Sequence, residues 1–216
     1  MPSIGEAVEQ AQSVRRAGPD EVSAMARVLA RAFHDDPAFT WVLRGDPHRM
    51  GILERGFELF LTRIWMEQEE TYTTSGIVVV AAWELPDRWK LGILEQLRLL
   101  PAMLRTFSRH TARIVRALIV LEGKHPREPH YYLAFFGAEP EWQGRGVGSA
   151  ALGPILARCD EESMPAYLEA STPRNRALYE RHGFAVTEEF TLGRGAPLQW
   201  RMWREPAGAA DQLAGA

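Results

Sequence analysis

The sequence predicts a single α/β domain, and three observations support this prediction. The chain has 216 residues, of which 46% are hydrophobic and 25% are charged, as is typical of one soluble globular domain. Its last third alternates strand-like and helix-like segments, and this order requires helices layered on a sheet. Residues 1–12 and 205–216 lack apolar periodicity, so we expect flexible tails around a domain at 13–204.

Hydrophobic periodicity and turn residues place the individual elements. In the first 130 residues they are a strand at 13–17, helices at 18–33, 50–66 and 91–122, and two strands within 71–85. We expect an interruption of the third helix at Pro101. This helical region is compatible with either a wall of a substrate site or a homodimer surface.

The last third predicts a tighter alternation of strands and helices. The strands lie at 131–138, 166–171, 184–192 and 197–205, and the helices at 148–162 and 173–183. Ser171 or Thr172 is a suitable N-cap for the last helix, and Pro173 suits its first turn. Gly183 is a typical C-terminal stop.

Composition also excludes several kinds of partner. A formal net charge of -3 gives no basic surface for nucleic acid or anionic lipid. The apolar run at 76–83 is too short to cross a membrane. Cys159 is the only cysteine, so a disulfide within the chain and a cysteine metal cage are both excluded. We therefore expect a cytoplasmic protein without a metal site.

A glycine-rich turn, "WQGRGVGSAAL" at 142–152, lies between a predicted strand and a predicted helix. A dinucleotide fingerprint would need a third glycine where Ser149 stands, and Glu169 lies inside its strand instead of closing it. A P-loop would need a lysine that this turn lacks. Successive backbone amides from Gly144 to Ser149 at a helix N-terminus instead favour pyrophosphate binding, with Arg145 as an added cation. A turn that only packs strand against helix is the alternative.

The motif "QGRGVG" fits the pattern Gln/Arg-x-x-Gly-x-Gly/Ala of the acetyl-CoA loop in the GCN5-related N-acetyltransferase (GNAT) family, which the surrounding sequence also resembles. The segment "YLEASTPRNRALYERHGF" resembles the family's fifth strand and following helix. "AFHDDP", "ELFLTR" and "FGAEPEWQGRGVGSA" resemble the subfamily of puromycin N-acetyltransferase and its relatives. The resemblance spans 16–204 and is weakest at 88–130. It implies a mixed, mostly antiparallel sheet flanked by helices, with a splayed strand pair at the cofactor site.

The resemblance further implies acetyl-CoA as the donor and CoA as the product. Main-chain groups of the fourth strand would bind the pantetheine arm and polarise the thioester. The implied cofactor-binding residues are Phe136, Gly137, Ala138, Gln143, Gly144, Arg145, Gly146, Val147, Gly148, Ser149, Asn175 and Tyr179.

Asn175 and Tyr179 are four residues apart and share one face of the predicted helix. A phenol with a pKa near 10 is able to protonate a departing thiolate. The resemblance places Tyr179 as this general acid and Asn175 as a contact to pantetheine or to an ordered water. A tyrosine that only packs its ring against the sheet is the alternative interpretation.

The general base is not fixed by the resemblance, because Tyr132 stands where some relatives have a glutamate. Glu169 is our first substitute, acting through water, and a structural role for its carboxylate is the alternative. His130, on the same strand face as Tyr132, is a second option.

For the acceptor we expect a primary amine on a small molecule, with an aminonucleoside or other amine antibiotic as one class. Asp35, Asp36 and Trp41 are candidates to bind it, although the two aspartates are equally compatible with a loop that ends a helix. Direct attack in a ternary complex is expected. A protein lysine or N-terminus as acceptor, or a CoA-binding module without turnover, are the alternative functions.

Overall fold

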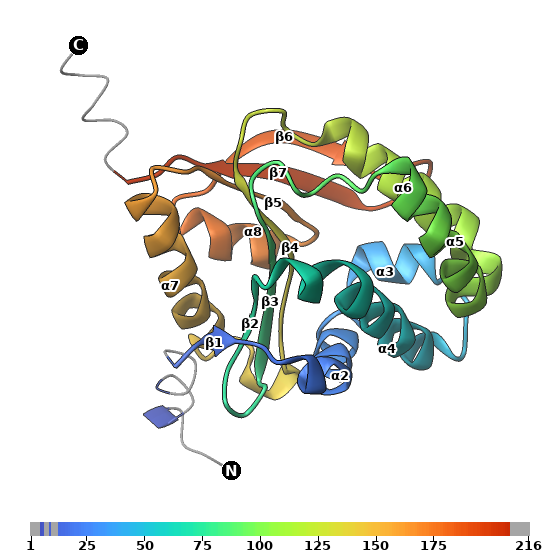
Figure 1. Cartoon of the computed structure of the whole chain (residues 1–216), viewed down its shortest axis with the longest axis horizontal. Coiled ribbons are helices and arrows are strands. Elements are labelled where there is room, and N and C mark those ends of the chain that lie inside the picture. The colour runs from blue at the N-terminus through green and yellow to red at the C-terminus, as the bar shows by residue number, and fades with distance from the viewer. Residues whose placement is uncertain (1–4, 7–8, 10–12, 208–216) are drawn as a thin grey trace.

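The computed structural model describes residues 5–6, 9 and 13–207, which form a seven-stranded sheet with helices on both faces (Figure 1). The strand order is β1-β2-β3-β4-β5-β7-β6, and every neighbouring pair is antiparallel except β4 and β5. The strands are β1 (Arg15–Arg16), β2 (Thr71–Thr73), β3 (Val79–Glu84), β4 (Tyr131–Ala138), β5 (Ala166–Ala170), β6 (Ala185–Thr191) and β7 (Leu198–Arg204). This architecture confirms the predicted single α/β domain with a mixed, mostly antiparallel sheet.

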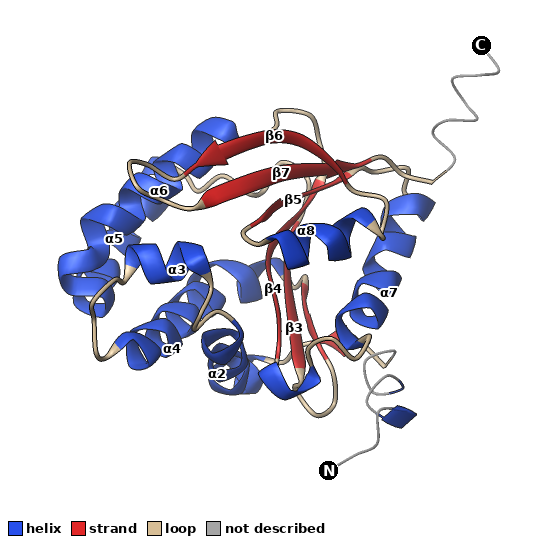
Figure 2. Ribbon diagram, turned by 180° about the vertical axis from the view of Figure 1, so that it is seen from behind, coloured by secondary structure: helices blue, strands red, loops and turns tan. Residues whose placement is uncertain are grey.

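The helices divide between the two faces of the sheet (Figure 2). They are α2 (Val22–Ala32), α3 (Pro37–Val42), α4 (Arg49–Phe60), α5 (Ile93–Phe107), α6 (Thr111–Lys124), α7 (Val147–Glu161) and α8 (Pro173–Glu180). The short 3-10 helices are η1 (Pro19–Glu21), η3 (Met66–Gln68), η4 (Ser108–His110) and η5 (Pro140–Trp142), and η2 (Leu61–Trp65) is a π-helix that follows α4 directly. Helices α2 and α4 share one hydrophobic core with β3, whereas α7 and α8 share a second core with β4 and β5.

Helix α2 shows why the apolar pattern specifies its position. Met25 and Leu29, one turn apart, are fully buried, as the helical spacing of the sequence predicts. Burying each of these side chains stabilises the fold by roughly 1.5–3 kcal/mol. The predicted ends are less accurate, because the first turn is the separate 3-10 turn η1.

The prediction of a helix interruption at Pro101 is wrong. Helix α5 runs through Pro101 without interruption, and the break comes instead at Ser108, which has a left-handed φ of 48°. Proline has no backbone N–H, so the helix loses one hydrogen bond at Pro101, but Pro101 is exposed, and Met103 and Phe107 still anchor the buried side of the helix. The stretch after Asp36, for which the sequence predicted no element, forms the short helix α3, with Asp36 as its N-cap and Pro37 in its first position.

The splayed strand pair is present between β4 and β5. Only Tyr131 and Tyr132 pair with β5, opposite Ala166 and Tyr167. A bulge bends β4 just beyond that point, because Ala82 and Trp83 of β3 pair with Phe135 and Leu133, which leaves Ala134 as an extra residue. The β5 side of β4 from Leu133 onward is therefore an open main-chain edge.

The predicted tails lie mostly outside the described residues. Of the expected N-terminal tail only 5–6 and 9 are described, and 208–216 are not described at the other end. The described C-terminal end is tied down by a hydrogen bond from the amide of Ala207 to Asp160 at 2.6 Å. No helix in the described part of the chain is long and apolar enough to span a membrane.

Candidate active site

The glycine turn between β4 and α7 presents a row of unpaired backbone amides. Gly144 and Gly146 have backbone φ values of 75° and 84°, which residues other than glycine rarely adopt. Gly146 is the N-cap of α7, so the amides of Val147, Gly148 and Ser149 form its open first turn. Among the described residues, no acceptor bonds the amides of 144–149. This geometry suits an anion with several oxygens, such as a pyrophosphate.

Two arginines and one glutamine surround this turn. Arg174, at the start of α8, lies so close that a Cβ added to Gly144 would be 3.2 Å from its Nη2. Arg145 lies over the Trp142 ring, 6.0 Å from the ring centroid. The Gln143 side chain donates to the Ala138 carbonyl at 3.0 Å and so ties the turn to β4. Arg174 was not predicted, because only the folded chain brings α8 beside the turn.

The first turn of α7 packs against both β4 and α8. A Cβ on Gly148 would lie 3.4 Å from the Phe136 ring and 3.8 Å from Leu178. Val147 is fully buried beneath the turn. Ser149 Oγ lies 2.7 Å from Nε2 of His182, a partner the sequence did not predict.

Gly137 allows helix α2 to approach the sheet closely. A Cβ at this position would lie 2.9 Å from the Ala32 side chain and 3.0 Å from that of Leu29. Its neighbours Phe136 and Ala138 face the opposite side, toward α7. The three predicted residues of β4 thus flank the open edge that the splay creates.

Helix α8 carries Asn175 and Tyr179, and it begins where the sequence predicts. Thr172 Oγ1 accepts the Asn175 amide at 3.1 Å, and Pro173 occupies the first helical position. Tyr179 is 6% exposed, and no hydrogen bond to its hydroxyl is made by any described residue. Burial, with the nearby charge of Asp36, raises the pKa of Tyr179 above its ordinary value. The phenol is therefore protonated throughout the physiological range.

The charge of Asp36 influences Tyr179, but the Asp36 carboxylate also stabilises the local structure. Its Oδ1 accepts the amides of Ala38 and Phe39 at 2.8 Å and 3.3 Å, while its Oδ2 accepts from the Ser171 hydroxyl. Burial raises the pKa of this carboxyl, although these hydrogen bonds oppose the rise. The Asp36–Ser171 contact ties the α2–α3 loop to the end of β5.

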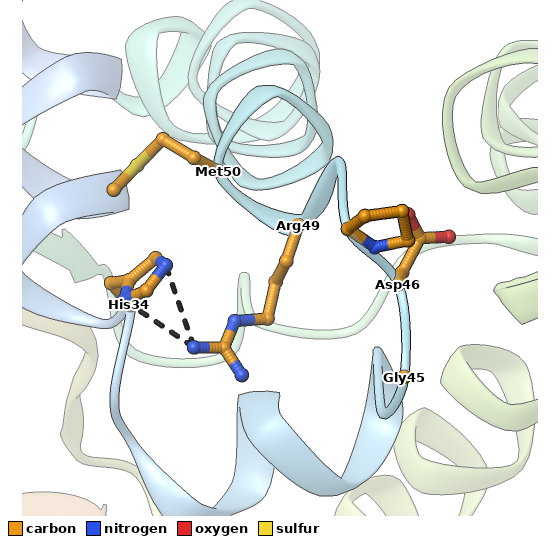
Figure 3. Close-up of a pocket in the computed structure, with 6 residues that line it drawn as sticks. His34, Gly45, Asp46, Arg49 and Met50 are labelled. Carbon is orange, nitrogen blue, oxygen red and sulfur yellow. Dashed lines mark hydrogen bonds between the residues drawn. The ribbon is translucent and has the colours of Figure 1, made fainter.

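Asp35 and Trp41 have partners of other kinds. Asp35 is largely exposed and contacts Nδ1 of His34 at 2.8 Å and Nη2 of Arg49 at 3.2 Å. His34 and Arg49 line a surface pocket of about 440 Å³ with Gly45, Asp46, Pro47 and Met50, where the Arg49 guanidinium points toward the His34 ring (Figure 3). The Trp41 ring instead lies under Arg113, 5.7 Å from it.

Glu169 is held between two phenols on the α2 side of the sheet. Tyr132 donates to its Oε2 at 2.8 Å and Tyr167 donates to its Oε1 at 2.7 Å. Burial raises the pKa of Glu169, and the two phenol hydrogen bonds and the charge of Arg201 oppose that rise. His130 contacts the Glu128 carbonyl at 2.6 Å and His125 at 3.0 Å, so both of its ring nitrogens have partners.

Comparison with known proteins agrees with this geometry. Residues 110–184 match the model of the Acetyltransferase (GNAT) family. An 84-residue stretch is 38% identical to an uncharacterised N-acetyltransferase of Schizosaccharomyces pombe, and covers 37% of this chain but only 34% of that protein.

Solved structures resemble the chain over most of its length. One, described as histone acetyltransferase HPA2 and related acetyltransferase from Corynebacterium glutamicum, is 26% identical with a TM-score of 0.67, over 90% of this chain and 96% of that one. A polyamine N-acetyltransferase of Drosophila melanogaster has a TM-score of 0.60 at 13% identity, over 89% and 98% of the two chains, which is a likeness of fold alone.

A sheet with one opened parallel pair, followed by an amide-lined turn at a helix N-terminus, defines the acyltransferase class to which these structures belong. The match of residues 110–184 to the family model and the likeness of fold over 90% of the chain support a place in the GNAT superfamily.

Proposed function

We propose that the protein transfers an acetyl group from acetyl-CoA to a primary amine of a small molecule, by direct attack within a ternary complex. The observation that carries the proposal is the row of unpaired amides at 144–149, in the turn that follows β4, whose β5 side is open from Leu133 onward. The match to the GNAT family model supports the same chemistry.

The donor fits the residues around the turn. The pyrophosphate of acetyl-CoA would accept the amides of Gly144 to Ser149, with Arg145 and Arg174 as cations beside it. The pantetheine arm would lie along the open edge of β4 and pair with its main chain as an added strand would. Asn175, whose side chain has no hydrogen-bond partner among the described residues, would contact the arm.

Tyr179 would act as the general acid. In the transfer the amine nitrogen forms a bond to the thioester carbonyl carbon and the carbon–sulfur bond breaks. The departing sulfur then takes the phenolic proton of Tyr179, which solvent replaces. Because its pKa is raised, Tyr179 carries that proton at neutral pH.

Glu169 would act as the general base. Tyr132 would pass the proton of the amine to it, a step for which the sequence suggested a water molecule. An alkylammonium with a pKa near 10 must lose a proton before it attacks. Tyr132 and Glu169 are both half-buried, and Tyr132 already donates to Glu169, so the two side chains would form a path for that proton.

The acceptor that we propose is a small cationic amine, with aminonucleosides and other amine antibiotics as one class to test. The Drosophila neighbour is named for polyamine acetylation, which supports a small amine. The relative described as a histone acetyltransferase supports a protein lysine as a second candidate. Asp36 is the predicted acceptor residue whose charge contributes to the raised pKa of Tyr179.

The proposal is tested by incubating the chain with acetyl-CoA and a panel of amines while free thiol is measured. The panel contains an aminonucleoside, a diamine, an arylalkylamine and a lysine peptide. We expect thiol release above background hydrolysis with at least one small amine. Acetyl-CoA binding without thiol release across the panel would instead indicate a binding module, and the proposal would then be wrong.

A further inference from the structure

A second buried carboxyl, that of Glu84 at the end of β3, lies beside the Tyr132–Glu169 pair. Glu84 is 5% exposed, and its Oε1 accepts a hydrogen bond from Nε1 of Trp65 at 2.9 Å. Its Oε2 is buried and has no partner among the described residues. Buried polar atoms are nearly always hydrogen-bonded, so an unpartnered carboxyl oxygen in the core calls for a functional explanation.

The register of the sheet places Glu84 next to Tyr132. Glu84 pairs with Tyr132, and Tyr132 pairs with Tyr167 on the next strand. Side chains at paired positions point to the same face and lie about 5 Å apart. Glu169 follows Tyr167 by two residues and so points to that face as well. Tyr132 therefore has one carboxyl group on each side, Glu84 on β3 and Glu169 on β5.

The surroundings of the two carboxyls favour different protonation states. Glu169 receives hydrogen bonds from two phenols and lies near Arg201. Glu84 has one indole donor only, so burial, and then the charge of Glu169, raises its pKa to about 8. The other titratable groups at this cluster are Tyr132, Tyr167, His125 and His130. Burial and the charge of Glu169 thus favour the protonated form of Glu84, whereas the hydrogen bonds to Glu169 and the charge of Arg201 favour the ionised form of Glu169.

The cluster lies where the two splayed strands still touch. Tyr132 is the last residue of β4 that pairs with β5, so the cluster is at the closed end of the gap between these strands. It lies on the α2 side of the sheet, because Trp65 belongs to the core that α2 and α4 share. Tyr179 belongs to the other core, so the proposed acid and base flank the gap from opposite faces.

We infer that Glu84 is a positioning residue of this reaction, which acts through Tyr132 and Glu169 on the proton that the acceptor amine gives up. This inference rests on the proposed acetyl transfer. An N–H bond of the ammonium breaks and an O–H bond forms on Tyr132, while the phenolic proton of Tyr132 passes to Oε2 of Glu169. An ionised Glu84 adds negative charge beside this path and makes Glu169 a stronger base. A protonated Glu84 does not.

The test compares kcat/KM of the wild type and of Glu84→Gln between pH 6 and pH 10, with the best amine of the panel. The ratio of the two values cancels the titration of the amine itself. We expect a ratio near one at pH 6.5 that rises to roughly tenfold at pH 9, the effect of one unit of basicity. Acetyl-CoA affinity, measured by calorimetry, should be the same in both proteins.

Two further variants separate this role from a structural one. Trp65→Phe removes the only hydrogen-bond donor to Glu84 among the described residues, so the rise of kcat/KM should move to higher pH. In Glu84→Gln this rise should instead be lost. Glu70→Gln is the matched control, since Glu70 is also 5% exposed but is paired with Arg16 and Arg158 away from the cluster. Its pH profile should match that of the wild type.

Carbon NMR of chains labelled at the glutamate carboxyls gives a measurement that does not depend on activity. One carboxyl should titrate near pH 8 in the wild type and in Glu70→Gln, and should be absent in Glu84→Gln. An active wild type with a flat ratio, or without that titration, would contradict the role of Glu84. A wild type that acetylates no amine would contradict the proposed function itself.

Discussion

At the residue scale, the chemistry depends on side chains whose surroundings fix their protonation. Tyr179 is buried near Asp36, and both influences raise the pKa of its phenol. Glu169 accepts from two phenols, one of which is nearer to solvent. The proposed acid thus keeps its proton, while the proposed base stays able to accept one.

Replacing Tyr179 by Phe should lower kcat roughly 10²–10⁴-fold, the usual contribution of a positioned general acid. Acetyl-CoA affinity should stay within a few-fold, because the ring is retained. Steady-state kinetics and calorimetry at neutral pH give both quantities.

Tyr131→Phe is the control for this substitution. Tyr131 donates its hydroxyl proton to Glu162 of the α7–β5 connection, away from the gap. Its loss should cost about 1 kcal/mol of stability and leave kcat unchanged. Equal activity losses in the two variants would show that Tyr179 acts through stability alone.

The stability of the protein should also depend on pH through Glu84. Burial raises the pKa of its carboxyl from 4.5 to about 8, so the folded chain keeps a proton that the unfolded chain loses. The stabilising contribution is complete below pH 4.5 and is lost as pH rises to about 8, at about 1.4 kcal/mol for each unit.

Urea unfolding of the wild type and of Glu84→Gln at pH 5, 7 and 9 measures this dependence. The wild type should lose more stability between pH 5 and pH 9 than Glu84→Gln does. Parallel curves for the two proteins would mean that Glu84 ionises at its ordinary pH.

At the element scale, the turn and the start of α7 act together as an anion site. Gly146, with its left-handed φ, ends the connection from β4 and is the N-cap of α7. The backbone amides in the first turn of α7 are therefore unpaired. Helix α8 adds Arg174 from the other side. The site is therefore a property of three neighbouring elements, not of the glycine motif alone.

Gly146→Ala should weaken acetyl-CoA binding about tenfold, because a left-handed alanine costs about 1–2 kcal/mol and the turn would relax from it. No atom lies within 4 Å of the added Cβ, so the strain of the backbone alone is tested. Calorimetry with acetyl-CoA measures the affinity.

Gly153→Ala is the matched control within the same helix. Its added Cβ also meets no atom within 4 Å, but its backbone is helical, so alanine should raise stability by up to about 1 kcal/mol. Its acetyl-CoA affinity should equal that of the wild type. Equal affinity in Gly146→Ala as well would contradict a role for this turn in binding the donor.

Sequence patterns predict elements better than contacts between them. The limits of β4 and the capping of α8 follow from local signals, namely an apolar run and Thr172 with Pro173. Pro101 misleads, because tertiary packing of α5 outweighs a local breaker. Glu84 and Arg174 are not predicted as site residues, since their roles come from partners on distant strands and helices.

At the scale of the whole molecule, the order of the strands determines where the proposed general acid and general base lie. The splay of β4 from β5 opens a main-chain edge, and the helices on the two faces bring Tyr179 and the Tyr132–Glu169 pair to its opposite sides. Helix α5 leaves Ile93, Leu94 and Leu97 exposed, so the choice between a substrate wall and a dimer surface stays a prediction.

Mass spectrometry of the products tests the central claim most directly. The wild type is incubated with acetyl-CoA and the best amine. The amounts of acetylated amine and free CoA and the mass of the protein are then measured in the same sample. Direct transfer predicts equal amounts of acetylated amine and CoA, with the mass of the protein unchanged and Cys159 unmodified. CoA release without acetylated amine, or a protein that carries the acetyl group, would contradict it.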